Sequence, residues 1–202
     1  AISIAAFFFL INSTIKTLVF RKSIQFFYVK NILPISFLAA VVGVYSLSYV
    51  PENILLYIIF ALSLYFLIKT IRSIFVASVK KKNKFVIYTM SLLSGFLQGT
   101  GLGSGGSLRK MFLLSEDLSL QQMHGTTSFI SAILLFASVT VRLFTEQVSV
   151  EILVPILYLL PIMIFANLLG KKVLKRVNKK TSNIIVIIVM LVLTMMLGIK
   201  VF

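Results

Sequence analysis

The 202-residue sequence contains no cysteine, a single histidine and only five acidic residues. The absence of cysteine excludes disulfide bonds, thiol chemistry and cysteine-ligated metals. An enzyme needs positioned acids, bases, nucleophiles or a metal ion, and the acids here lie in the connections between apolar segments. The sequence therefore predicts neither an enzyme nor a bound cofactor. Cation transport is also disfavoured, because carboxylates at mid-membrane depth are the usual ligands of transported cations.

Apolar residues and positive charge are both in excess. The hydrophobic fraction is 59% and the mean hydropathy is +1.05, whereas an ordinary globular domain is about 45–50% apolar. The 20 Lys and Arg residues give a formal charge of +15. They stand at the ends of apolar runs, so they indicate membrane topology rather than a nucleic-acid partner. We therefore predict an all-α, multi-pass membrane protein, with the lipid bilayer as its surroundings.

Seven apolar segments can be drawn between charged or turn-forming residues. They cover residues 1–20, 32–47, 53–79, 85–114, 122–144, 152–169 and 183–202. The positive-inside rule places the basic stretches 21–30, 80–84 and 170–180 in the cytoplasm. The connections that hold Glu52 and Glu146 then face outward.

The fourth segment fits this topology only if it returns to the side from which it enters. A full crossing would place the basic stretch 170–180 outside. Six glycines between Gly95 and Gly106 supply a break, which predicts a re-entrant hairpin with half-helices at about 85–98 and 107–114. Non-helical backbone at membrane depth is tolerated where protein or a water-filled cavity covers it. We therefore expect these glycines to line a cavity, although tight helix packing is the other use of glycine in membranes.

The segments also suggest an internal repeat. The first three cross in the opposite sense to the last three, as in a weak inverted repeat, and transporters built in this way bind substrate at the repeat interface. Residues 1–79 would form the first repeat and residues 80–202 the second, which includes the hairpin 85–114. The repeat also leads us to expect that a matching hairpin precedes Ala1.

The hairpin predicts an anion site. A half-helix that begins near Ser107 would present free N–H groups and a positive dipole end at mid-membrane. Candidate substrate-binding residues are Gly103, Ser104, Gly105, Gly106, Ser107, Arg109, Thr127 and Ser128, with Gln98, Thr100 and Arg142 in second rank. Arg109 could grip an oxyanion bidentately or extend to the interface. Thr127 and Ser128 could bind substrate or bond to neighbouring helices, while Lys110 and His124 are assigned to the membrane interface.

The segment from Gly95 to Arg109 reads GFLQGTGLGSGGSLR, and Gly125-Thr126-Thr127-Ser128 opens the next span. Together these motifs resemble the sulfite exporter TauE/SafE family, which has a glycine-rich segment, a following helix and a Thr-Ser pair. Ser104 stands where many members have a third consecutive glycine. The resemblance implies export of sulfite, organosulfonates or similar small anions.

Our hypothesis is a secondary transporter or exporter of a small oxyanion, sulfite-like or sulfonate-like, that works by alternating access in a bacterial-type plasma membrane. The alternative is a non-transporting membrane subunit that packs against partner chains through its glycines. The sequence leaves open the substrate, the direction, the coupling ion (proton or sodium) and whether the chain forms a homo-oligomer.

Overall fold

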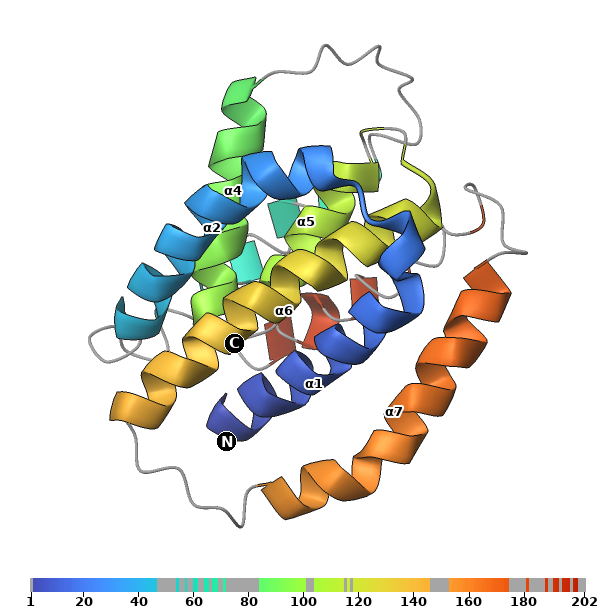
Figure 1. Cartoon of the computed structure of the whole chain (residues 1–202). Helices are drawn as coiled ribbons and strands as arrows, with labels where there is room; N and C mark the ends of the chain where they lie inside the picture. The colour runs from blue at the N-terminus through green and yellow to red at the C-terminus, as the bar shows by residue number, and fades with distance from the viewer. Residues whose placement is uncertain are drawn as a thin grey trace. The chain divides into compact units, whose positions relative to one another are not determined.

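The computed structural model shows an assembly of α-helices (Figure 1). It describes residues 2–46, 84–100, 104–114, 116, 118–145 and 153–174, together with scattered helical positions between 54 and 71 and between 181 and 199. The continuous helices are α1 (Ile2–Phe20), α2 (Phe26–Ser46), α4 (Lys84–Gly99), α5 (Ser104–Leu114), α6 (Leu120–Thr145) and α7 (Leu153–Leu174), with a short 3-10 turn, η1 (Arg21–Ser23), after α1. The described residues include no β-strand. The all-helical prediction is thus confirmed for this part of the chain.

Several helix ends differ from those expected. Helix α2 begins at Phe26 rather than residue 32, because Lys30 is exposed and Asn31 donates from Nδ2 to the Phe27 carbonyl at 2.7 Å. Both polar residues are therefore compatible with a helix. Helix α7 continues five residues past the expected end at 169, into the basic stretch. The predicted third and seventh segments lie outside the continuously described residues.

The predicted break in the fourth segment is present. Helix α4 ends at Gly99 and α5 begins at Ser104. The first residues of α5 return against the last turn of α4, since a Cβ on Gly105 would meet the Ser94 carbonyl oxygen and the Gln98 backbone nitrogen. The two helices thus form a tight hairpin.

Helices α2 and α4 approach each other at backbone distance. A Cβ on Gly95 would collide with the Ser36 backbone, and a Cβ on Gly99 would collide with the Ala40 backbone. On the opposite helix, Gly43 meets the Phe96 carbonyl in the same way. Small residues spaced by four allow such contacts between helices in membranes. Here, glycine therefore serves close helix packing as well as the break.

Helices α1 and α6 lie side by side in opposite directions. The start of α6 meets the end of α1, where Gly125 packs against the Phe20 carbonyl. Thr126 Oγ1 accepts a hydrogen bond of 2.9 Å from the Gln25 backbone N–H. This bond ties the start of α6 to the connection after α1.

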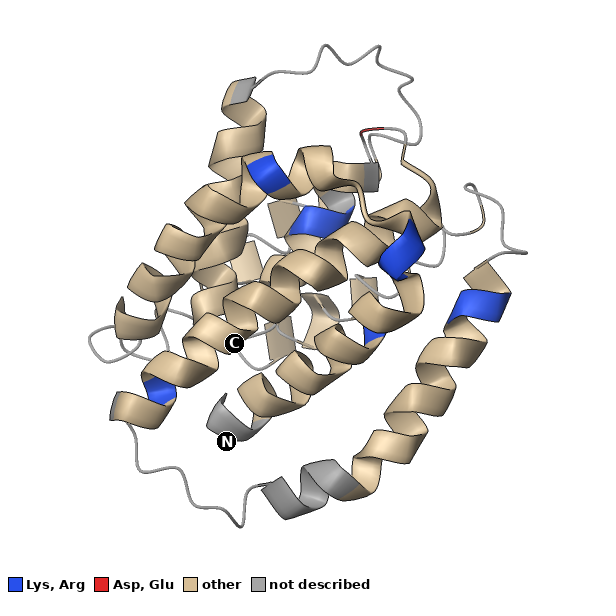
Figure 2. Cartoon of the chain, in the orientation of Figure 1, with Lys and Arg blue, Asp and Glu red and all other residues tan. Residues whose placement is uncertain are grey.

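The outer surface of these helices is strongly apolar. Phe144 is 88% exposed and Phe85 is 73% exposed, and Figure 2 shows Lys and Arg at only a few places along the helices. Two described helices are long and apolar enough to cross a bilayer, Phe26–Ser46 and Leu120–Phe144, with mean hydropathies of 1.7 and 1.8; Phe85–Gly99 is a shorter apolar helix. The exposed apolar residues are those that lipid would cover.

The chain divides into two compact units. One holds residues 1–48 and 83–176, and the other holds residues 49–82 and 177–202. Within the second unit, a Cβ on Gly198 would lie 3.2 Å from the Phe60 ring. Positions from the predicted third and seventh segments therefore pack against each other. The site described next lies wholly within the first unit.

Candidate functional site

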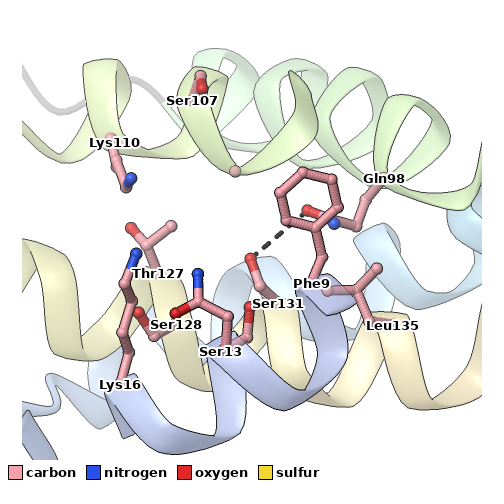
Figure 3. A pocket seen from close by; sticks show the side chains of 12 residues that line it. Phe9, Ser13, Lys16, Gln98, Ser107, Lys110, Thr127, Ser128, Ser131 and Leu135 are labelled. Carbon is pink, nitrogen blue, oxygen red and sulfur yellow. Dashed lines mark hydrogen bonds between the residues drawn. The ribbon is translucent and has the colours of Figure 1, made fainter. Parts of the chain in front are cut away.

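A polar cavity of about 180 Å³ lies among α1, α4, α5 and α6 (Figure 3). The residues that line it are Phe9, Asn12, Ser13, Lys16, Gln98, Gly106, Ser107, Lys110, Thr127, Ser128, Ser131 and Leu135. Its volume is below the roughly 300–1,000 Å³ of pockets for drug-sized ligands. The space therefore suits a small ion with some of its water.

Hydrogen-bond donors dominate the lining. Two lysines, four hydroxyl groups from serine and one from threonine, and two amides face the cavity, and no acidic side chain lines it. Asn12 has its oxygen engaged, because Oδ1 accepts a hydrogen bond of 2.9 Å from Asn167 Nδ2. Its amide nitrogen remains as the donor end. A wall of this composition is chemically suited to an anion.

Two features of the sequence bring polar groups of α5 and α6 together at the cavity. The glycine break places the first turn of α5, with Gly106 and Ser107, at the cavity rather than inside a continuous helix. Free N–H groups at such a helix start favour negative charge. On α6, Thr127 and Ser128 precede Ser131 by four and three residues, so that each lies near Ser131 on the helix surface, and all three line the cavity.

Thr127 carries a buried hydroxyl with no partner in the described part of the chain. The residue is only 2% exposed and lines the cavity, and its Oγ1 forms no hydrogen bond there. A buried hydroxyl without a partner is costly and uncommon in proteins. A bound ligand that accepts from Thr127 would remove this cost.

Arg109 lies directly behind the lining. It is 1% exposed, and its Nη2 donates to Gln98 Oε1 at 2.6 Å and to Ser131 Oγ at 2.8 Å. Since a guanidinium only donates, the oxygen of Gln98 must face Arg109, which leaves Nε2 as the donor of that amide. Ser131 also donates to the same Gln98 oxygen at 3.4 Å. Arg109 therefore orients two lining side chains, and it is not among the residues that line the cavity.

The sequence-based candidates fall into three groups. Five of them line the cavity: Gln98, Gly106, Ser107, Thr127 and Ser128. Four are described elsewhere: Gly105 packs against α4, Arg109 lies behind the lining, Thr100 Oγ1 donates to the Leu97 carbonyl at 2.9 Å, and Arg142 Nη2 donates to the Gly99 carbonyl at 3.3 Å. Gly103 and the side chain of Ser104 lie outside the described residues.

The sequence reasoning missed the contribution of α1. Phe9, Asn12, Ser13 and Lys16 all line the cavity. Their spacing of three, four and seven residues places them on one face of a helix, and three polar residues on one face of an apolar helix are a signal that could have been used. Lys110 was assigned to the interface but also lines the cavity. His124 instead stacks on Phe20, with ring centroids 6.0 Å apart.

Apolar helices, a broken hairpin and a polar cavity rich in hydrogen-bond donors are the features expected of an α-helical membrane transporter. The family model for the sulfite exporter TauE/SafE family matches residues 1–197. The chain belongs to this family, whose members are multi-pass membrane transporters rather than enzymes. No curated protein and no solved structure matches the chain significantly.

Proposed function

We propose that this protein exports a small oxyanion, sulfite-like or organosulfonate-like, and binds it in the cavity between α1, α4, α5 and α6. The observation that carries the proposal is the composition of the lining, which joins two lysines to seven hydroxyl or amide groups without a carboxylate. Lys16, Lys110, Thr127 and Ser128 would contact the anion. Arg109 would hold Gln98 and Ser131 in place and add positive charge from behind.

The hairpin supports a re-entrant topology. Helix α5 has 11 residues, which span about 17 Å, whereas the hydrocarbon core of a bilayer is about 30 Å thick. The helix is therefore too short to cross alone. With a hairpin that returns to its own side, the basic stretches 21–30, 80–84 and 170–180 all face the cytoplasm.

The arrangement of helices supports transport by alternating access between two inverted repeats, 1–79 and 80–202. Helices α1 and α6 come from equivalent places in the two repeats, run in opposite directions and both line the cavity. Another equivalent pair, the third and the seventh segments, belongs to one compact unit. A substrate site at a repeat interface is the usual arrangement in such transporters.

The test is flux of sulfite from proteoliposomes combined with thiol labelling at the cavity. The chain has no cysteine, so a Ser107→Cys variant carries a single thiol. We expect a water-soluble thiol reagent to modify it and sulfite to protect it. A Ser119→Cys variant is the control, because Ser119 is also exposed but does not line the cavity. It also reports any direct consumption of the reagent by sulfite.

The proposal would be overturned by two results together. One is a flux of sulfite no greater than that of empty liposomes. The other is labelling of Ser107→Cys that neither sulfite nor an organosulfonate slows relative to Ser119→Cys. Imposing a proton or a sodium gradient in the same vesicles would identify the coupling ion.

A further inference from the structure

Two ammonium groups from different helices face the same small cavity. Lys16 comes from α1 and Lys110 comes from α5, and Figure 3 shows their side chains extending toward Thr127 from opposite sides. Either lysine alone would suffice to neutralise a singly charged anion. The presence of both is the observation from which the charge of the ligand can be inferred.

No negative charge of the protein offsets these lysines within the described residues. Glu116 is the one acidic residue there, and it does not line the cavity. Its Oε2 accepts a hydrogen bond of 3.1 Å from the Tyr28 hydroxyl. Among the described residues, nothing balances the positive charge of the cavity, and a bound anion would do so.

Arg109 adds a third positive charge behind the lining. The partners of its Nη2 are neutral, namely an amide and a hydroxyl, and its Nε and Nη1 have no hydrogen-bond partner among the described residues. Charges interact strongly at the low effective dielectric of a buried site, and unpaired buried charges are costly. Each additional negative charge on a ligand would thus gain attraction to all three cations, and this attraction must exceed the added cost of dehydrating the ligand.

We propose that the cavity selects a doubly charged small oxyanion over a singly charged one of the same shape, and that Lys16 and Lys110 set this preference. The inference rests on the proposed function, since it concerns the ligand of that same cavity. The competing outcome is an organic monoanion whose short apolar group contacts Phe9 and Leu135, the two apolar residues of the lining.

Sulfate and methanesulfonate separate these outcomes. Both are tetrahedral at sulfur, and they differ by the replacement of one charged oxygen with a methyl group. Binding is measured with each ion by calorimetry on the purified full chain and by competition against sulfite flux in proteoliposomes. We expect sulfate to bind at least about tenfold more tightly, which corresponds to one neutralised contact at a buried site.

Variants of Lys16 and Lys110 test whether these two residues cause the preference for sulfate. Lys16→Met and Lys110→Met should each lower sulfate affinity by at least about tenfold and methanesulfonate affinity by much less, so that the ratio of the two approaches one. A merely structural effect would weaken the binding of both ions alike and leave this ratio of affinities unchanged. Lys16→Arg and Lys110→Arg should retain the preference. Lys30→Met is the control, since Lys30 is exposed on α2 and does not line the cavity.

The outcomes separate the two proposals. Equal affinities for the two ions, or tighter binding of methanesulfonate, would overturn the charge preference and leave anion transport standing. A preference for sulfate that survives both methionine variants would overturn the assignment to Lys16 and Lys110. If sulfate, methanesulfonate and sulfite neither bind the protein nor cross the membrane, both the charge preference and the proposed function are refuted.

Discussion

The two sides of α4 use neighbouring residues in opposite ways. Gly99 faces α2, where any side chain would collide with the Ala40 backbone, while Gln98 faces the cavity and is held by Arg109. On the first side, helices are close because side chains are missing. On the second, Gln98 lines a polar cavity together with side chains of α1, α5 and α6. The comparison suggests that the close contact fixes the hairpin so that the cavity can stay open.

The largest expected effect comes from adding a side chain where α4 packs closely against α2. Gly99→Leu should destabilise the protein by at least about 3 kcal/mol, the upper end of the usual cost of overpacking, because backbone atoms cannot rotate away. Thermal unfolding in detergent would measure it. Gly170→Ala is the matched control, since a Cβ there meets nothing within 4 Å. Alanine in a helix should even stabilise it by up to about 1 kcal/mol. Equal unfolding midpoints for Gly99→Leu and wild type would refute the role of close packing.

An intermediate effect is expected from Gln98→Glu on the cavity side. The new carboxylate would pair with Arg109 and reduce the positive potential of the site. Anion affinity should then fall by at least about tenfold, or about 1.4 kcal/mol, with no loss of thermal stability. Gln122→Glu adds the same charge outside the cavity lining, near the start of α6. Unchanged sulfate binding by Gln98→Glu would show that the cavity potential does not govern affinity.

The smallest effects are expected from two adjacent threonines, and they should be opposite in kind. Thr127→Val should lower anion affinity about three- to tenfold, as for the loss of one hydrogen bond, without destabilising the fold, because its hydroxyl has no partner in the described residues. Thr126→Val should cost about 1 kcal/mol of stability and leave affinity unchanged, since it accepts from Gln25. Calorimetry and thermal unfolding on both variants would check the contrast. If both variants changed affinity and stability in the same way, the two threonines would not have separate roles.

Sequence reasoning located the hairpin because a cluster of glycines interrupts an apolar span regardless of what surrounds it. It assigned those glycines mainly to the cavity, whereas Gly95 and Gly99 pack against α2 and Gly105 packs within the hairpin. Both uses require the absence of a Cβ, so glycine content cannot distinguish them. The deciding neighbours, Ser36 and Ala40, come from a distant part of the chain.

The polar face of α1 shows a different difficulty. Asn12 and Lys16 were visible in the sequence, but their role depends on which helices lie opposite them. Arg109 illustrates the converse, because the sequence left open whether it binds substrate or extends to the interface, and the structure shows it buried with Gln98 and Ser131 as partners. A single sequence does not reveal that Arg109 Nη2 donates hydrogen bonds to Gln98 and Ser131. Tertiary contact decides whether a buried arginine touches a ligand.

The position of Arg109 has a consequence for the speed of transport. A carrier must release its cargo as readily as it takes it up, so a favourable but easily broken interaction is better than a clamp. A guanidinium that bonds directly to the anion would have to break those bonds in every cycle. One that acts through Gln98 and Ser131 attracts the anion from a distance and keeps its own bonds when the anion leaves. The site would then combine strong attraction with rapid turnover.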